Sequence, residues 1–299
     1  MKSANHMIQV ALRLLKTSGA FLVLLAAVLP SIRADEIRIV SQTVGTDELL
    51  LALAEPEQIA ALSHLARDEV YSAVADQAKA YPQLISGDSE TILKYRPTLV
   101  LGADFSRVEL LQQVENAGVR VIRFTRYESF EDAYANLRLL ARELGPRAER
   151  KAEVIIMACE KRVTELKQRL AGRDLVRVIA PSTYGVIGGD QTTFQDLCNH
   201  AGAENLASTL GGLVGHEAPP IEQMLTWPIE KVVLASESVE SVEKALRPYE
   251  KLPPYSFIEA IRLRRVALIK PYMLSSVSHH RVDGYEELAR ALHPEAFVE

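Results

Sequence analysis

Several histidines lie in loops that the sequence predicts. His279 and His280 are adjacent before the last expected helix, and His64 follows an expected strand. Imidazole can ligate a metal, carry a proton or hydrogen-bond a ligand. Adjacent side chains rarely point the same way, so we do not expect His279 and His280 to bind one metal together. Ligand contact and plain solvent exposure both remain open for the pair, and His64 has a structural hydrogen bond as its alternative.

The sequence lacks the short motifs that mark common catalytic sites. It has no G-x-S-x-G, no P-loop, no H-E-x-x-H, and no G-x-G-x-x-G at the first expected strand-to-helix turn. Residues 185–189 are rich in glycine and follow a strand, but their spacing fits no phosphate-binding loop. This pattern favours a flexible loop beside a ligand. We therefore expect a protein without catalytic residues, metal ligands or a cofactor of its own.

Several aromatic side chains could offer a flat, amphipathic surface to a large ligand. Tyr71, Tyr184 and Tyr272 are the candidates, although a single tyrosine is more often a packing residue than a binding residue. His216 lies in a stretch rich in Gly and Pro (208–220), which we expect to be a surface loop. Solvent exposure is the default for that histidine.

A long helix is expected to position these groups. Residues 146–172 begin after Gly145 and end at Gly172, with apolar residues at helical spacing and charges between them. About 25 helical residues span roughly 37 Å, the width of a small domain. The sequence therefore predicts two lobes joined by a rigid helix. A long helix lying on one larger domain is the alternative.

Strand and helix patterns alternate on both sides of this helix, which is typical of the α/β class. The first half has expected strands at 37–41, 59–62, 98–101 and 119–124. Its first expected helix is capped by Thr46 and Asp47. Further helices are expected at 71–80, 89–93, 106–117 and 129–144. The second half has expected strands at 176–180, 232–234 and 265–270, and helices at 193–201 (capped by Thr193), 220–227, 239–246 and 283–292. We expect two Rossmann-like lobes with parallel sheets.

A short internal repeat relates the two halves. Glu90 precedes Val100 by the same interval that separates Glu222 from Val232, and a proline lies between the members of each pair. Both glutamates fall in the first turn of a short expected helix, where a carboxylate interacts favourably with the helix dipole. That effect explains each one singly but not their matching positions. The repeat predicts a pseudo-symmetric pair of lobes, with a chance match as the alternative.

The N-terminus has the pattern of a secretory signal peptide. Basic residues precede the short apolar run 20–29, a small residue follows at Ala34, and no acidic residue occurs before Asp35. The uncharged run is short for a membrane span, although an uncleaved anchor is the alternative. We expect cleavage after Ala34 and a periplasmic location.

Charge and cysteine content narrow the class further. The 34 basic residues include four in the leader, so the mature chain has 30 basic and 39 acidic residues, a formal net charge of −9. Such an acidic surface argues against a nucleic-acid partner. Cys159 and Cys198 fall in separate expected helices, so nothing in the local sequence pairs them.

Taken together, several segments resemble periplasmic substrate-binding proteins of the cobalamin and iron-complex type, which serve bacterial ABC importers. The resemblance covers nearly all of the mature chain. It rests on the order and spacing of 38–41 (RIVS), 90–101 (ETILKYRPTLVL), 118–122 (GVRVI), the long helix, and 202–207 (GAENLA).

The resemblance implies an organisation and a partner. Two α/β lobes (35–145 and 173–299) would be joined by the helix 146–172, after a signal peptide at 1–34. A monomer would hold its ligand in the cleft between the lobes. Glu90 and Glu222 would dock onto arginines of a permease dimer in the inner membrane, each marking one lobe.

The expected ligand is an iron complex, such as a ferric siderophore, or cobalamin. Haem-binding relatives often have a tyrosine just before the first glutamate helix, whereas residues 84–87 contain none. The expected ligand-contacting residues are Gln42, Thr43, His64, Tyr71, Tyr184, Gly185, His216, Met273, His279 and His280. An exported enzyme acting on a metal chelate, and a ligand sensor of the same fold, are the alternative functions.

Overall fold

The first sheet lies in the N-terminal half of the chain. The computed structural model describes residues 37–84, 86–236 and 242–298, so the expected signal peptide lies outside the described residues. All strand pairs in this sheet are parallel, and the strand order is β2-β1-β3-β4. The strands are β1 (Ile39–Ser41), β2 (Ile59–Ala61), β3 (Leu99–Ala103) and β4 (Arg120–Phe124). Burial of β1, β2 and β3 on both faces explains their runs of apolar residues.

The second sheet repeats the first in the C-terminal half. Its strands are β5 (Val176–Ile179), β7 (Ala203–Asn205), β9 (Lys231–Ala235) and β10 (Val266–Ile269), all parallel. Their order, β10-β9-β5-β7, is the order of the first sheet read from the other edge. Val100 pairs with neighbours on both sides, and Val232 occupies the equivalent central position. The matching topology supports the internal repeat and confirms the expected α/β class.

Helices cover both sheets. The N-terminal half contains α2 (Val44–Leu53), α3 (Ala75–Ala78), α4 (Ser89–Lys94), α5 (Val108–Asn116) and α6 (Phe130–Leu144). The C-terminal half contains α8 (Thr193–Ala201), α9 (Leu206–Thr209), α10 (Ile221–Met224), α11 (Val242–Leu246), α12 (Glu259–Arg262), α13 (Pro271–Ser275) and α14 (Arg281–Leu292). Among the described residues, no helix has both the length and the apolar character needed to cross a membrane.

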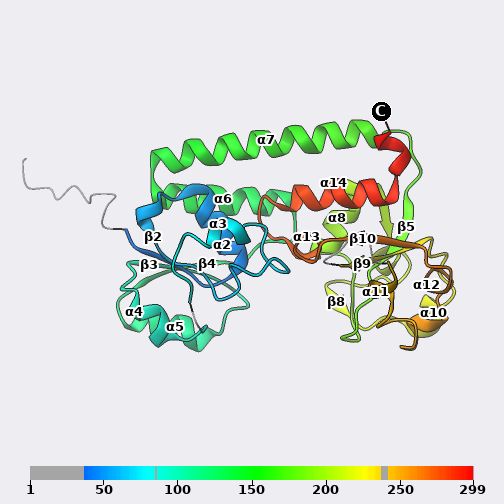
Figure 1. Ribbon diagram of the computed structural model, residues 1–299, viewed down its shortest axis with the longest axis horizontal. Helices are drawn as coiled ribbons and strands as arrows, with labels where there is room; N and C mark the ends of the chain where they lie inside the picture. Colours follow the sequence, from blue (N-terminus) through cyan, green and yellow to red (C-terminus); the bar gives the residue numbers. More distant parts are fainter. Residues whose placement is uncertain (1–36, 85, 237–241, 299) are drawn as a thin grey trace, which may run out of the picture. The chain divides into compact units, whose positions relative to one another are not determined.

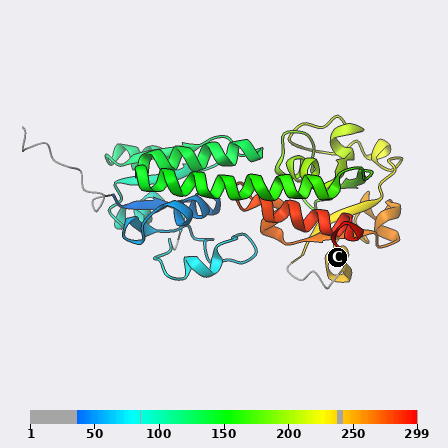
Figure 2. The ribbon, with the colours of Figure 1, turned by 90° about the horizontal axis from the view of Figure 1, so that it is seen from above.

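The long helix α7 (Pro146–Leu170) connects the two halves, as predicted. It lies beside α6 at one end and beside α14 at the other (Figures 1 and 2). Its buried residues, including Ala152, Ile156 and Leu166, belong to one apolar core that also contains Leu137 of α6 and Tyr285 of α14. The described chain from Ile37 onwards is accordingly a single compact unit.

Four local predictions differ from the structure. Thr43 caps α2 rather than Thr46 and Asp47, because Thr46 occupies the third helical position of a capping box. The helix expected at 71–80 is reduced to Ala75–Ala78, because earlier residues of that stretch form turns around Asp68. Thr192, not Thr193, caps α8.

The expected loop 208–220 contains strand β8 (His216–Glu217), which pairs antiparallel with β6 (Ile187–Gly188). Part of the helix expected at 239–246 lies outside the described residues.

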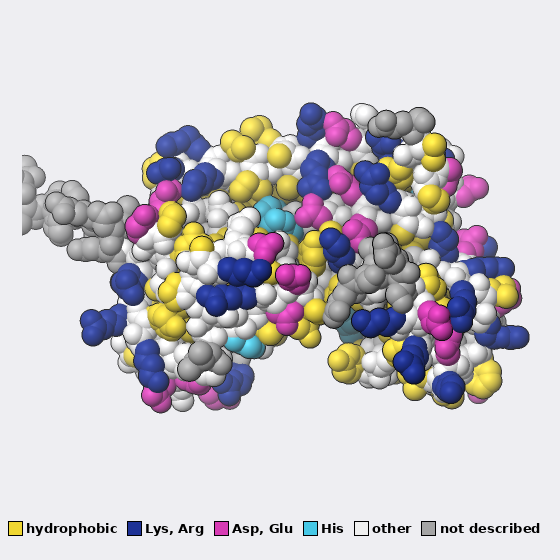
Figure 3. Space-filling model, viewed as in Figure 1, with side chains coloured by type: hydrophobic (Ala, Val, Ile, Leu, Met, Phe, Trp, Pro, Cys, Tyr) yellow, Lys and Arg dark blue, Asp and Glu magenta, His cyan; other side chains and the backbone are white. Residues whose placement is uncertain are grey.

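The surface carries charges of both signs. On the face viewed in Figure 3, basic and acidic side chains are interspersed rather than separated into large patches. Cys159 and Cys198 are buried free thiols in α7 and α8.

Candidate functional site

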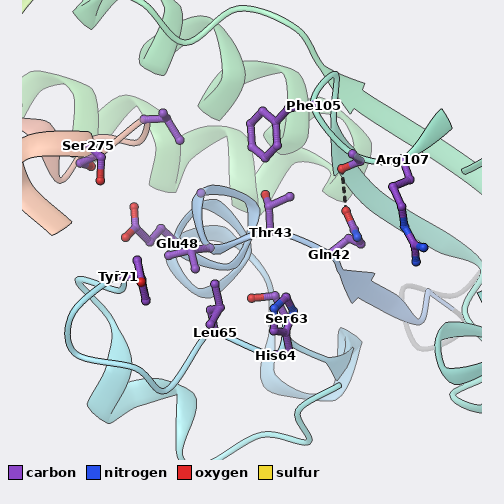
Figure 4. Close-up of a pocket in the computed structure, with 15 residues that line it drawn as sticks. Gln42, Thr43, Glu48, Ser63, His64, Leu65, Tyr71, Phe105, Arg107 and Ser275 are labelled. Atoms are coloured by element: carbon purple, nitrogen blue, oxygen red, sulfur yellow. Dashed lines mark hydrogen bonds between the residues drawn. The ribbon is translucent and has the colours of Figure 1, made fainter. Parts of the chain in front are cut away.

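A cavity of about 380 Å³ opens where the first sheet presents the carboxyl ends of its strands. Ligands of open α/β sheets bind at this edge. Three turns that follow β1, β2 and β3 supply most of the wall, and a loop after α13 completes it (Figure 4). We call residues 275–280, which are the last residue of α13 and the loop that follows it, the strap. The lining residues are Gln42, Thr43, Val44, Gly45, Glu48, Ser63, His64, Leu65, Tyr71, Phe105, Ser106, Arg107, Ser275, Ser276 and Val277.

The turn after β1 is fixed by hydrogen bonds among small polar side chains. Thr43 caps α2 by accepting a hydrogen bond from the backbone N–H of Thr46, and the Thr46 hydroxyl lies 2.8 Å from that of Ser41. The hydroxyl of Ser106 donates to Oε1 of Gln42 at 2.6 Å, shown by the dashed line in Figure 4. The turns after β1 and β3 are therefore joined at the cavity wall.

Two consecutive buried carboxylates near the start of α2, Asp47 in the first turn and Glu48 directly after it, hold the neighbouring segments. Asp47 accepts hydrogen bonds from the hydroxyl of Ser63 and from its backbone N–H, at 2.9 Å for the latter. Ser63 immediately precedes His64, so this contact places the His64 turn. Burial raises the pKa of Asp47 to about 7.

The second of these carboxylates, Glu48, has partners in both halves of the chain. It accepts a hydrogen bond from the backbone N–H of Ala73 at 3.1 Å and another from the hydroxyl of Ser278 in the strap. Burial raises the pKa of Glu48, although the positive charge of His280 and these two hydrogen bonds oppose that effect.

The strap packs closely on α2. A Cβ atom at Gly45 would lie 2.4 Å from Cγ2 of Val277, so only glycine permits this approach. Ser276 is buried beside it, and its hydroxyl makes no hydrogen bond to any described residue. The strap thus closes the N-terminal pocket with residues from the C-terminal half.

Aromatic and basic side chains are exposed at the rim. Phe105 is 64% exposed and meets Tyr127 edge-on, with ring centroids 5.7 Å apart. Tyr71 and His64 are exposed on the opposite side of the cavity (Figure 4). Arg107 donates one hydrogen bond to the carbonyl of Gly87 at 2.7 Å and is otherwise open to solvent. This surface suits a large ligand that has apolar faces and anionic groups.

The structure brings together four of the ten expected contact residues: Gln42, Thr43, His64 and Tyr71 line the cavity. His279 and His280 belong to the strap and Met273 lies near it, but none of the three lines the cavity. Met273 is buried in α13. Tyr184, Gly185 and His216 are exposed in the C-terminal half and do not line the cavity, Tyr184 being 91% exposed.

The two strap histidines have different environments. Burial lowers the pKa of His279 to about 3, and its Nδ1 has no hydrogen-bond partner among the described residues. Burial also lowers the pKa of His280, but its hydrogen bond to Asp283 at 3.3 Å and the charge of Glu48 outweigh this and raise the pKa overall. Within the described ranges, no group of three or more His, Cys, Asp or Glu side chains is arranged to hold a metal ion.

Glu90 and Glu222 occupy corresponding surface helices. Both are exposed in the first turn, Glu90 in α4 and Glu222 in α10. Asp88 caps α4 by accepting a hydrogen bond from the N–H of Thr91 at 2.7 Å. Glu90 lies 3.1 Å from Lys94, an exposed pair that contributes little to stability.

Sequence reasoning missed several lining residues: Glu48, Phe105, Arg107 and residues 275–277 of the strap. Phe105 and Arg107 follow β3 directly, so the rule that ligands bind at the ends of parallel strands could have found them. No local pattern indicated that residues 275–277 would reach the other half of the chain.

Comparison with known proteins places this architecture in a family. A family model described as periplasmic binding protein matches residues 39–272. The chain belongs to the periplasmic binding protein family. Among curated proteins, this family member is 22% identical over 223 residues to an uncharacterized ABC transporter substrate-binding lipoprotein, YvrC, of Bacillus subtilis. That match covers 70% of this chain and 66% of the relative, just under two thirds of its length.

Solved structures show the same fold. The periplasmic heme-binding protein RhuT from Roseiflexus sp. RS-1 is 21% identical with a TM-score of 0.73, covering 87% of this chain and 99% of that one. A periplasmic heme-binding protein from Pseudomonas aeruginosa is 23% identical with a TM-score of 0.71, covering 86% and 92%. The periplasmic heme-binding protein HutB of Vibrio cholerae has a TM-score of 0.71 at 18% identity, covering 86% of this chain and 99% of that one.

Proposed function

We propose that this protein is the binding component of an ABC importer. It captures a large iron complex or corrinoid in the cavity whose lining includes Gln42 and Val277. The observation that carries the proposal is the cavity itself. Its wall comes from the N-terminal sheet, and the strap from the C-terminal half closes it. A ligand held there contacts both halves of the chain, so the importer can distinguish loaded from empty protein.

The rim favours a chelate with a large apolar face and peripheral negative charge. Phe105 and Tyr71 offer aromatic area, and Arg107 offers a guanidinium to carboxylate, phenolate or propionate oxygens. Ferric siderophores and haem have both features, and cobalamin has the size and the apolar faces. The heme-binding relatives of the same fold add weight to a tetrapyrrole or iron ligand.

The permease of the importer would bind the two exposed glutamates. Glu90 and Glu222 lie on helices that precede equivalent central strands, β3 and β9. In this proposal the lobes are residues 35–145 and 173–299, joined by 146–172, and a monomer docks one glutamate of each lobe onto arginines of the permease dimer. Rim charges of this kind set orientation and association rate more than affinity.

Export to the periplasm is part of the proposal, with the signal peptide 1–34 removed after Ala34. The N-terminal sequence of protein recovered from the periplasm tests this directly. A mature chain beginning at Asp35 is the expected result, whereas an intact N-terminus in the membrane fraction would indicate an uncleaved anchor.

The ligand assignment is tested by a thermal-shift titration of the mature protein with haemin, cobalamin and a panel of ferric siderophores. A ligand present at 100 times its Kd adds about 2.7 kcal/mol of apparent stability. A shift with one class identifies the ligand. Absence of a shift with every class contradicts the proposal and favours a sensor or an enzyme acting on another chelate.

A further inference from the structure

The carboxylate of Glu48 joins two segments that are far apart in sequence. It is 2% exposed and accepts hydrogen bonds from the Ala73 backbone and from the Ser278 hydroxyl. Ala73 belongs to the N-terminal half, and Ser278 belongs to the strap from the C-terminal half. One side chain therefore bridges the halves of the molecule through buried polar contacts.

Both segments that Glu48 holds also form walls of the cavity. Tyr71 lies two residues before Ala73, and Val277 immediately precedes Ser278. Neither segment has regular secondary structure at these positions, so their hydrogen bonds largely determine their positions. A ligand that moves Tyr71 would also move Ala73, which is two residues away. Because the carboxylate of Glu48 binds both Ala73 and the strap, the strap would move as well.

Burial of the Glu48 carboxylate carries an unfavourable free energy of desolvation. An apolar side chain of similar volume would avoid the loss of hydration, but it would leave the Ala73 N–H and the Ser278 hydroxyl without an acceptor. The charged neighbours are of both signs. Asp47 is adjacent on α2, His280 faces Glu48 from the strap, and Asp283 on α14 is paired with Arg162 of α7.

We infer that Glu48 is a positioning residue that couples the Tyr71 segment to the strap, so that a ligand in contact with Tyr71 also influences the strap. The ligand-driven part of this inference rests on the proposed function. The coupling between the two segments does not, because it is a property of the ligand-free protein and can be measured without any ligand.

The test uses two serine-to-alanine substitutions in the strap. Ser278→Ala removes the hydroxyl that binds Glu48, whereas Ser276→Ala removes a neighbouring buried hydroxyl that has no hydrogen-bond partner among the described residues. Amide hydrogen exchange is followed at Ala73, whose N–H is held by Glu48. The amide of Val70 is the internal control, because it donates to Asp68 in the same segment.

Coupling predicts that Ser278→Ala raises exchange at Ala73 by roughly fivefold, the effect of losing one net hydrogen bond. Exchange at Val70 stays unchanged, and Ser276→Ala leaves both amides within twofold of the wild-type rate. Urea unfolding of each variant separates this local effect from a global loss of stability. Equal exchange at Ala73 in the two serine variants overturns the inference.

A reciprocal measurement gives a second test. Glu48→Gln keeps the size of the side chain but removes one acceptor oxygen, and exchange is then followed at His280, whose N–H donates to the Ser278 hydroxyl at 3.1 Å. Coupling is mutual, so this exchange should also rise several-fold. An unchanged rate at His280 means that Glu48 supports only its own half. Either result stands apart from the ligand titration, which tests the function alone.

Discussion

The guanidinium of Arg281 lies 3.1 Å from the carboxylate of Asp196, and both side chains are buried. Arg281 begins α14 directly after the strap, and Asp196 lies in α8. The same guanidinium donates to the backbone carbonyl of Tyr127 in the N-terminal half at 2.9 Å, while the Tyr285 hydroxyl donates to Asp196. The pair thus anchors the strap and contacts both halves of the chain.

Replacing Arg281 with leucine should lower the free energy of unfolding by about 3–5 kcal/mol, because the buried carboxylate of Asp196 loses its guanidinium partner. Arg290→Leu is the matched control, since this residue is exposed on the same helix. Urea unfolding measures both. The double variant Arg281→Leu with Asp196→Leu should lose less than the sum of the single losses. Equal losses for Arg281→Leu and Arg290→Leu would contradict this assignment.

Asp47 should make the protein less stable as the pH rises. Its pKa in the folded state, about 7, lies above the ordinary value of 3.8, so the folded chain binds the proton more tightly than the unfolded chain. The stability due to this proton is present at low pH and is lost as the pH rises through 7. Between pH 5 and pH 8 the wild type should lose about 2–3 kcal/mol more than Asp47→Asn, as measured by urea unfolding. Parallel pH profiles for the two proteins would rule out a raised pKa.

Phe105 should contribute directly to ligand affinity. Phe105→Ala is expected to weaken binding about tenfold or more, because it removes an aromatic surface from the rim. Phe257→Ala is a matched control, since Phe257 is 65% exposed but lies in the C-terminal half and does not line the cavity. Calorimetric titration with the ligand found by thermal shift measures both. Loss of affinity in the Phe257 variant alone would place the ligand elsewhere.

Reversing the charge of both docking glutamates should separate transport from binding. Glu90→Lys with Glu222→Lys is expected to abolish uptake in cells while ligand affinity stays within twofold, because neither residue lines the cavity. The control carries Glu109→Lys and Glu243→Lys, which are also exposed in first turns of helices. Normal uptake by the Glu90→Lys, Glu222→Lys variant would show that the importer does not bind these two carboxylates.

Local patterns predicted most elements of the fold, including seven of the eight strands of the two parallel sheets, but not strand β7 or the short helices α9, α12 and α13. Runs such as Leu99–Ala103 are apolar because both faces of the strand are covered, and α7 repeats its apolar residues with helical period. The order of strands was not predicted, but the spacing of Glu90 and Glu222 from their central strands indicated that the two sheets would correspond.

The site was less predictable because its parts meet only in three dimensions. Acidic residues near the start of a helix ordinarily interact with the helix dipole at the surface, yet Asp47 and Glu48 are buried because the start of α2 faces the loops after β2 and the strap. The residue pair Gly45 and Val277 is separated by more than 200 positions. Tyr184 follows the end of a parallel strand, where ligands are expected to bind, but it does not line the cavity.

The apolar core beneath α7 has a consequence for how the molecule unfolds. Leu137, Ile156 and Tyr285 belong to one continuous cluster, although they come from the N-terminal half, the connecting helix and the C-terminal half. Melting either half alone would expose the part of this cluster that the other half buries. We therefore expect a single heat-absorption peak in calorimetry, with equal calorimetric and van't Hoff enthalpies. Neither half should persist as a stable, soluble fragment after cleavage between residues 171 and 175.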